Sequence, residues 1–401
     1  ENPQVKLIYS DEDKIDEQGN RCEPYFKSQW NERLFFEQNM ISHLGVYHRK
    51  LIEQVGGFRE GYEGAQDHDL ALRCVERIRP HQILHIPEVL YHWRILPGST
   101  AKQSSEKSYA LTAAEKSITN TIERRQLKAT VQADPKTSYC RLKYHLPEEA
   151  PLVSIIIPTR DGLDVLEPCI DSVSRLTDYQ NFEILIVDNQ SSDPETLSYF
   201  RKFEKNKTIR VLSYDQPFNY AAINNYAVKK CKGSLICFLN NDTEVISREW
   251  LTEMVAELHQ RDVGAVGAKL LYTDNTVQHA GVILGVGTKD GVAGHGLLGI
   301  SKSEGGYFSY AQLSREVSAV TAACLLTTRE TFQEVGGFNE LDLAVAFNDI
   351  DLCLKIREAG FKIVWTPHAL LHHHESKSRG LEDTAEKQAR FSNEVNYMLK
   401  T

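Results

Sequence analysis

Short apolar runs alternate with helix-spaced segments from Pro151 onward, and this alternation constrains the fold more than any other feature of the chain. The runs 153–158, 182–187 and 235–239 are apolar, and residues 163–176 between the first two have helical spacing. Strands that alternate with helices are typical of a parallel sheet, whose crossover connections are nearly always right-handed. The sequence therefore predicts an α/β fold, with a mostly parallel sheet and helices on both faces.

Length, charge and cysteine use narrow the class of protein. A chain of 401 residues favours two or three domains, and we expect two. A net charge of -9 provides no basic surface for nucleic acid, so we expect no nucleic-acid partner. The eight cysteines include no C-x-x-C pair, which favours a reducing, cytoplasmic location. No apolar run approaches the roughly 18 residues of a membrane span, so we expect any membrane association to be peripheral, at the inner face of the cell membrane.

Three motifs occur twice in the same order, which indicates an internal repeat. The pairs are 7–13 with 238–244, Gly56-Gly-Phe58 with Gly336-Gly-Phe338, and 66–73 with 348–355. The first occurrence lacks the strands that precede the second. We therefore expect residues 1–145 to form the C-terminal half of a domain, and residues 146–401 to form a complete one.

The boundary between the two units is expected in the segment 133–151, which contains three prolines and few apolar runs. Residues 101–127 have helical spacing and would close the first unit. Half a domain would expose an edge strand. We therefore expect the fragment 1–145, expressed alone, to be insoluble or to pair with another chain. We also expect the native chain to extend about 100 residues upstream, the size of half a domain.

Two carboxylates, Asp242 and Glu244, follow an apolar strand directly. Ligands of open parallel sheets bind at the carboxyl ends of the strands, and carboxylates suit a hard divalent cation. A solvated loop is the competing interpretation of so short a motif. The apolar strand before it, and the similar segment Asp11-Glu-Asp13, favour a ligand site.

Further motifs follow the other strands and helices in order. They are Pro158-Thr-Arg-Asp161, Asp188-Asn189, Ala222-Ile-Asn-Asn225, Asn348-Asp-Ile-Asp351 and His372-His-His-Glu-Ser. Together with the motifs above, they resemble glycosyltransferase family 2, which has the nucleotide-diphospho-sugar transferase (GT-A) fold. The resemblance is greatest to multidomain bacterial enzymes that build rhamnose-containing or O-antigen polysaccharides, the latter a part of lipopolysaccharide. It covers about residues 151–380, and residues 5–100 as the second half of another copy.

The resemblance implies that a nucleotide-diphosphate sugar, a dTDP- or UDP-sugar, is bound by residues at the strand ends. These are Thr159, Arg160, Asp161, Asp188, Asn225, Asn241 and Asp242. A divalent cation, Mn²⁺ or Mg²⁺, would be held by Asp242, Glu244 and His373. The family usually has Asp where Glu244 stands, and His374 is the rival of His373. The implied equivalents in the first copy are Asp11, Asp13, Asp67 and His92.

The resemblance also implies that Asp349 is the general base that takes the proton of the acceptor hydroxyl. A carboxylate is tolerated at a helix start, although plain N-capping, taken alone, is the commoner explanation. Asp351 and His279 are expected to contact the acceptor. His279 belongs to the Gly-rich segment 264–306, which we interpret as a lid over the site.

The implied reaction is an inverting, metal-dependent transfer of a sugar to a hydroxyl of a growing cell-surface polysaccharide. Rhamnose is one candidate for the transferred sugar. The acceptor would be the polysaccharide or a lipid-linked oligosaccharide. Two alternatives stay open. The N-terminal copy can be a non-catalytic scaffold or acceptor-binding module, and the whole chain can bind nucleotide sugars without catalysis.

Overall fold

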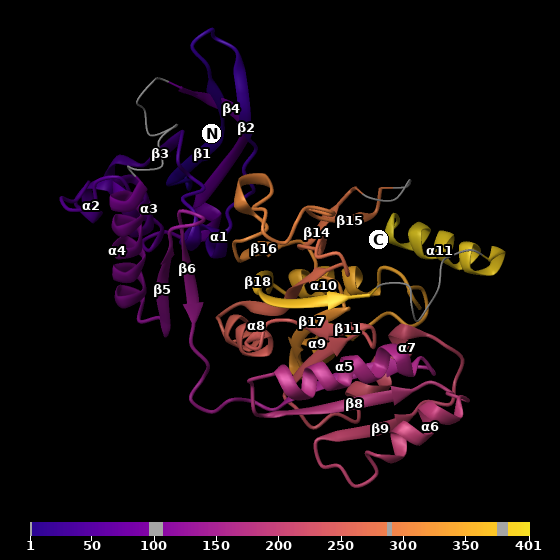
Figure 1. Cartoon of the computed structure of the whole chain (residues 1–401). Coiled ribbons are helices and arrows are strands. Elements are labelled where there is room, and N and C mark those ends of the chain that lie inside the picture. Colours follow the sequence, from indigo (N-terminus) through magenta and orange to yellow (C-terminus); the bar gives the residue numbers. More distant parts are fainter. Residues whose placement is uncertain (1, 96–106, 287–290, 375–383) are drawn as a thin grey trace. The chain divides into compact units, whose positions relative to one another are not determined.

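The structure is a computed structural model that describes residues 2–95, 107–286, 291–374 and 384–401 (Figure 1). The chain forms two compact units, Glu1–His145 and Leu146–Thr401. Each unit has its own sheet and its own helices, and each is described here by itself.

The second unit is built on a sheet whose neighbours run in the order β11-β18-β12-β17-β10-β7-β8-β9. These strands are β7 (Val153–Thr159), β8 (Phe182–Asp188), β9 (Ile209–Ser213), β10 (Leu235–Leu239), β11 (Thr243–Val245), β12 (Val263–Leu271), β17 (Cys324–Thr328) and β18 (Lys362–His373). Strands β10, β7, β8 and β9 are parallel, as are β12 and β18. The predicted α/β fold is confirmed, with antiparallel β17 inserted between β10 and β12.

Shorter strands extend this sheet and form a separate hairpin. β13 (Val277–His279) pairs with β12, and β16 (Arg315–Val317) pairs with β18. β14 (Val282–Leu284) and β15 (Ala293–His295) form a two-stranded sheet of their own.

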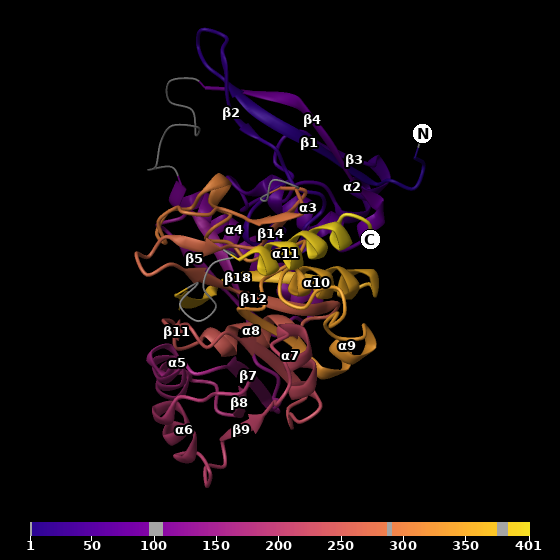
Figure 2. The same cartoon turned by 90° about the vertical axis from the view of Figure 1, so that its right-hand side faces the viewer.

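Helices cover both faces of the sheet because alternate residues of the central strands point to opposite sides. Ile184 and Ile186 of β8 pack into one apolar cluster, and Leu185 and Val187 pack into another. The first cluster includes residues of α5 (Leu163–Leu176), α6 (Pro194–Arg201) and α8 (Trp250–Leu258). The second includes residues of α7 (Tyr220–Val228), α9 (Arg329–Glu334), α10 (Asn348–Glu358) and α11 (Ala385–Met398). Figure 2 shows β7 and β8 between α5 and α7.

The first unit has a four-stranded sheet around β1 (Leu7–Ile15). β2 (Arg21–Tyr25) and β3 (Gly45–Tyr47) are antiparallel to β1, and β4 (Ile83–Arg94) is parallel to it. The helices are α1 (Glu32–Glu37), α2 (Arg49–Val55), α3 (Gln66–Val75) and α4 (Lys107–Arg125), and a hairpin of β5 (Ala129–Asp134) and β6 (Tyr139–Tyr144) follows.

The two units divide between His145 and Leu146, inside the segment 133–151, but the first half of that segment belongs to β5 and β6 rather than to a linker. β6 pairs with β5, and Cys140 and Leu142 are buried while Arg141 and Lys143, which follow each of them, are more exposed. This alternation is the period of a half-buried strand, and the nearby prolines obscured it. The expected helix over 101–127 is observed as α4, and residues 101–106 lie outside the described part.

Strand pairing corrects one of the three repeat pairs. β1 is parallel to the long strand β4 and antiparallel to β3, just as β12 is parallel to β18 and antiparallel to β17. β11, which carries Glu244, is instead antiparallel to β18. The match of Asp11–Asp13 with Asp242–Glu244 is therefore wrong, because acidic residues after a strand are too common to identify which strand it is.

The Gly-Gly-Phe pair keeps its correspondence in the structure. Gly56 and Gly57 follow α2 with φ of 81° and 67°, and Gly336 and Gly337 follow α9 with φ of 82° and 69°. Left-handed backbone of this kind favours glycine because a Cβ atom would clash with the chain. The same turn therefore ends the same short helix in both units.

Candidate active site

A cavity of about 530 Å³ lies in the second unit, where residues directly after β7, β8 and β10 meet the start of α10. Parallel strands place their carboxyl ends at one edge of the sheet, which explains why distant segments converge there. The cavity is lined by Pro158, Thr159, Arg160, Asn189, Phe218, Tyr220, Ile223, Asn240, Asn241, Asp242, Gln278, His295, Thr321, Ala322, Ala323, Val345, Ala346, Phe347, Asn348, Asp349, His373, Lys387 and Arg390.

Four of the predicted donor-binding residues line this cavity together. They are Thr159, Arg160, Asn241 and Asp242. The amide of Asn241 donates to the hydroxyl of Thr159 over 3.0 Å, which joins the end of β7 to the loop after β10. These four residues form the strand-end rim of the cavity.

The other predicted donor-binding residues hold loops in place around the rim. Asp161 accepts hydrogen bonds from the amides of Ser192 and Asp193, at 2.8 and 2.9 Å. Asp188 accepts from the amide of Ser191 at 2.9 Å. Neither of these carboxylates lines the cavity, whereas Asn189, next to Asp188, does.

Asn225 also lies outside the cavity lining and connects α7 to the Gly-Gly-Phe turn. Its side chain donates to the carbonyl of Phe338 over 2.9 Å and accepts from the amide of Phe338 over 3.0 Å. A Cβ atom on Gly337 would stand 2.8 Å from the Asn225 side-chain oxygen, so the turn needs glycine there. Asn225 thus positions the segment that leads to α10.

His373 and Asp242 form the centre of the polar cluster. His373 Nδ1 lies 2.7 Å from Gln278 Oε1, and an amide oxygen only accepts, so Nδ1 carries the proton of the neutral ring. Nε2 then presents a lone pair, which accepts from Asn240 Nδ2 at 3.1 Å and stands 3.2 Å from Asp242 Oδ1. A carboxylate oxygen and an imidazole lone pair on one side of a cavity can bind a divalent cation.

Glu244 is not brought to this pair. Its Oε1 lies 2.8 Å from His374 Nε2, and its side chain is 41% exposed. Asp242 precedes β11, whereas Glu244 lies within it and is placed by the pairing of β11 with β18. Within the described residues, no group of three or more His, Cys, Asp or Glu side chains is placed to hold a metal ion. A cation here would therefore need further ligands from its substrate or from water.

Asp349 lines the cavity at the first turn of α10. Its Oδ2 accepts from the amide of Ala322 at 3.0 Å, and its Oδ1 accepts from the amide of Ile350 at 2.9 Å. Asp351 lies outside the lining and forms an ion pair with Lys355 at 2.9 Å. Of the two acidic residues in the first turn of this helix, only Asp349 lines the cavity.

His279 is buried, with 1% of its surface exposed, and it does not line the cavity. Its Nδ1 lies 2.7 Å from Nδ1 of His295, which does line it. The structure therefore places His295 between the predicted acceptor residue and the cavity. Both histidines belong to the predicted Gly-rich lid segment.

Sequence reasoning missed Lys387 and Arg390, which line the cavity from α11. α11 is held to the site by an apolar contact of Phe391 with Phe347 and by Glu394, which accepts from the amide of Val345 at 2.8 Å. The sequence feature that could have revealed these two residues is their spacing of three positions, which places two cations on one face of a helix. The charged composition of this segment masked it.

The predicted residues of the first unit are paired with neighbouring side chains. Asp13 bonds to His92 and Arg21, and Asp11 Oδ1 lies 2.7 Å from His85 Nε2. Although burial opposes its ionisation, the hydrogen bonds of His92 and Arg21 hold the pKa of Asp13 below its usual value. Asp67 accepts from Asn39 over 2.9 Å. Asp13 and His92 are thus brought together.

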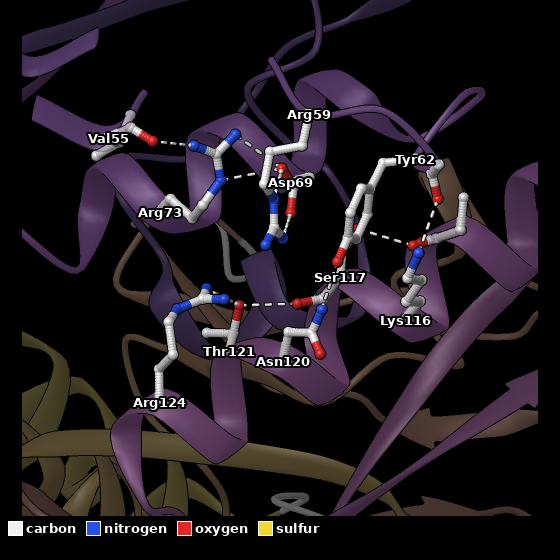
Figure 3. Close-up of polar contacts among 12 residues, drawn as sticks. Val55, Arg59, Tyr62, Asp69, Arg73, Lys116, Ser117, Asn120, Thr121 and Arg124 are labelled. Atoms are coloured by element: carbon white, nitrogen blue, oxygen red, sulfur yellow. Dashed lines mark hydrogen bonds and ion pairs between the residues drawn. The ribbon is translucent and has the colours of Figure 1, made fainter. Parts of the chain in front are cut away.

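Asp69, two residues after Asp67, is held between two arginines (Figure 3). Arg59 and Arg73 both donate to its carboxylate, and Arg73 also donates to the carbonyls of Val55 and Gly57, at 2.6 Å each. Burial opposes the ionisation of Asp69, but these hydrogen bonds outweigh it and lower its pKa. This network ties α3 to the turn after α2.

Comparison with protein families identifies the cavity-bearing unit. Residues 154–307 match the model of glycosyl transferase family 2. The chain contains a family 2 glycosyltransferase domain. The match begins in β7 and includes the Asp242 loop, β13 and the β14–β15 hairpin, so it covers most of the segments around the cavity.

Two relatives of this domain match nearly the whole chain. The chain is 50% identical over 401 residues to the uncharacterized protein y4gI of Sinorhizobium fredii, of which it spans 44%. It is 38% identical over 378 residues, 94% of its length, to the O-antigen biosynthesis protein RfbC of Myxococcus xanthus, of which it spans 29%. The chain thus spans less than half the length of each of these relatives.

A solved structure shares the fold of the family 2 domain. It is GalNAc-T7 with UDP, GalNAc and Mn²⁺, with a TM-score of 0.50 and 16% sequence identity over 67% of this chain and 51% of that chain. At this identity the likeness concerns the fold alone, which is the predicted GT-A fold. Among the described residues, none of the helices combines the length and apolar character that crossing a bilayer requires.

Proposed function

We propose that the second unit transfers a sugar from a nucleotide-diphosphate donor to a hydroxyl of a growing cell-surface polysaccharide, with inversion at the anomeric carbon. The observation that carries this proposal is the cavity itself, which is lined at once by Asp242 and His373 and by Asp349. The first two suit the charged end of a donor, and the third suits proton removal from an acceptor. The similarity to an O-antigen biosynthesis protein supports a polysaccharide acceptor.

The donor end of the site is the strand-end rim. Thr159 ends β7, and Arg160 and Asn189 follow β7 and β8, where a nucleoside of a dTDP- or UDP-sugar would bind. Asp242 and His373 would hold the divalent cation, Mn²⁺ or Mg²⁺, and the diphosphate oxygens would complete its ligand set. The ion would supply charge neutralisation for the departing diphosphate.

The two cationic side chains of α11 would contact the diphosphate group of the donor. Lys387 and Arg390 line the cavity, so their charges lie where a diphosphate group can reach them. Arg390 Nε lies 3.5 Å from Glu394 Oε2, and the Glu394 side chain is only 2% exposed. This buried partner restricts the orientations that the guanidinium group can adopt. Fixed cations that face developing negative charge lower the barrier because they need no reorganisation during the reaction.

Asp349 is the base in this proposal. The acceptor oxygen forms a bond to the anomeric carbon as the bond from that carbon to the diphosphate oxygen breaks, and the electron pair of that bond leaves with the diphosphate. The acceptor proton passes to Asp349, whose carboxylate is aimed by the amides of Ala322 and Ile350. A single displacement of this kind inverts the configuration.

The first unit is proposed to be a non-catalytic scaffold or acceptor-binding module. The observation that favours this role is the pairing of its acidic side chains with its own basic ones, Asp13 with Arg21 and Asp69 with Arg59 and Arg73. Carboxylates neutralised in this way are poorly suited to bind a metal ion. We further propose a cytoplasmic location at the inner face of the cell membrane, where lipid-linked acceptors are made.

The proposal is tested by thermal unfolding of the whole chain with a panel of dTDP- and UDP-sugars, with and without Mn²⁺. A ligand at 100 times its Kd stabilises the folded state by about 2.7 kcal/mol, because it binds that state alone. We expect stabilisation by a nucleotide sugar that requires Mn²⁺ and is lost in Asp242→Ala. A panel that stabilises neither protein would contradict a donor site.

A further inference from the structure

A pair of histidines connects the buried side of the lid segment to the cavity. His279 ends β13 and His295 ends β15, and their Nδ1 atoms lie 2.7 Å apart with the rings at 88°. His279 is 1% exposed, whereas His295 is exposed and lines the cavity. For two Nδ1 atoms at this distance to form a hydrogen bond, one of them must carry a proton and donate the hydrogen bond to the other.

The neighbours of His279 decide which of the two donates. The backbone amide of Thr321 donates to His279 Nε2 at 3.4 Å, so Nε2 is an acceptor without a proton. Burial, together with the positive charge of Arg315, lowers the pKa of His279 well below its usual value, and the ring stays neutral. The single N–H proton of the His279 ring is then on Nδ1, and this Nδ1–H donates a hydrogen bond to Nδ1 of His295.

The consequence for His295 is a fixed tautomer. Its Nδ1 accepts from His279, so in the neutral ring the proton lies on Nε2. The Nε2–H of His295 therefore lies on the side of the ring that faces away from His279, while Nδ1 is held by this buried partner. Second partners of this kind fix both the tautomer and the orientation of an imidazole.

The same backbone segment holds both this pair and the proposed base. The amide of Thr321 bonds to His279, and the next amide, that of Ala322, bonds to Asp349 at 3.0 Å. Thr321, Ala322, Asp349 and His295 all line the cavity. His295 is thus placed by the segment that aims Asp349, rather than by the strand-end rim that would bind the nucleotide.

We propose that His295 binds the acceptor saccharide, its Nε2–H donating to a hydroxyl oxygen of the sugar that reacts at Asp349, and that His279 is the positioning residue that sets this tautomer. This inference rests on the proposed function. It identifies the acceptor-binding side of the same cavity and corrects the residue that contacts the acceptor from His279 to His295.

The tautomer is tested first, by long-range ¹H–¹⁵N NMR on the whole chain labelled with ¹⁵N-histidine. The signals of His295 are assigned by their loss in His295→Ala. We expect a neutral His295 protonated on Nε2, and a change of its tautomer or a mixture of tautomers in His279→Phe. A wild-type His295 protonated on Nδ1 overturns the inference whatever the variants do, so it does not depend on the folding of His279→Phe.

The acceptor contact is tested by kinetics with the nucleotide sugar that stabilises the protein most, and with a panel of p-nitrophenyl glycosides as acceptors. Loss of one hydrogen bond in His295→Ala should raise the glycoside KM about tenfold. Donor Kd and the slow hydrolysis of the donor by water should change less than about twofold, because water replaces the acceptor there. His295→Gln, whose amide nitrogen can occupy the place of Nε2, should recover part of the loss.

His259→Ala is the matched control, since His259 is exposed at the end of α8 and does not line the cavity. An unchanged glycoside KM in His295→Ala overturns the inference. Equal losses in donor Kd, hydrolysis and transfer also overturn it, because they would assign His295 to the donor. A protein that binds none of the nucleotide sugars refutes the proposed function instead, and the NMR result still stands by itself.

Discussion

The sharpest test of the proposed mechanism is Asp349→Asn, because the two interpretations of Asp349 predict losses of different size. As a helix-start carboxylate, Asp349 accepts two backbone hydrogen bonds, from Ala322 and Ile350. The asparagine keeps one acceptor oxygen and loses the negative charge. One lost hydrogen bond costs about 1 kcal/mol, and the charge at a helix start contributes about 0.3–1 kcal/mol. The free energy of unfolding should therefore fall by roughly 1–2 kcal/mol.

If Asp349 is the general base, its substitution should raise the reaction barrier by more than it lowers the free energy of unfolding. Loss of a positioned base lowers the rate about 10²- to 10⁴-fold. This corresponds to about 3–5 kcal/mol in the barrier, at about 1.4 kcal/mol for each factor of ten. The expected loss of activity thus exceeds the expected loss of stability, and donor binding should change little because the amide is nearly isosteric with the carboxyl group.

The assay measures transfer rate, donor Kd and urea unfolding for the same preparation of the whole chain. Asp274→Asn is the matched control, because Asp274 also accepts a backbone hydrogen bond, from Thr276 at 2.9 Å, but lies outside the cavity lining. It should lose stability without losing activity. Turnover of Asp349→Asn within about fivefold of the wild-type value would refute the role of base.

Three further results are expected. Asp242→Ala should weaken Mn²⁺-dependent donor binding at least about tenfold by calorimetry, whereas Glu244→Ala, whose carboxylate is turned away, should stay within about threefold; equal losses would contradict this cation site. Lys387→Ala should weaken binding of UDP or dTDP about tenfold more than binding of the monophosphates, with the exposed Lys400→Ala as control, and a loss shared equally by mono- and diphosphates would argue against a diphosphate contact. Asp69→Asn should destabilise the first unit by roughly 3 kcal/mol near neutral pH, because it leaves buried arginine charge unpaired. The lowered folded pKa of Asp69 gives stability that is present above its unfolded value near 3.8 and is lost as the pH falls through the folded value, so the wild-type advantage in urea unfolding should disappear on acidification, and a pH-independent difference would contradict it.

The periodicity of the sequence determined the α/β fold and the rim of the site. The apolar runs 153–158, 182–187 and 235–239 are local signals, and a parallel sheet places the residues after such runs at one edge. The family resemblance assigned Thr159 and Asp242 to one site, and this edge of the sheet explains how they meet although 83 positions separate them along the printed sequence. The order of the motifs also identified the family, since each motif alone is short.

Only the tertiary structure decided which side chains face the cavity. Glu244 turns to His374 because β11 pairs with β18, and His295 rather than His279 lines the cavity because His279 is buried where β13 pairs with β12. The pairing of β1 with β4 likewise corrected the repeat, because acidic residues after a strand look alike in sequence whichever strand carries them. Lys387 reaches the site only through the packing of α11. Each of these outcomes depends on contacts between residues far apart in the chain, and local patterns of charge and hydrophobicity carry no information about such contacts.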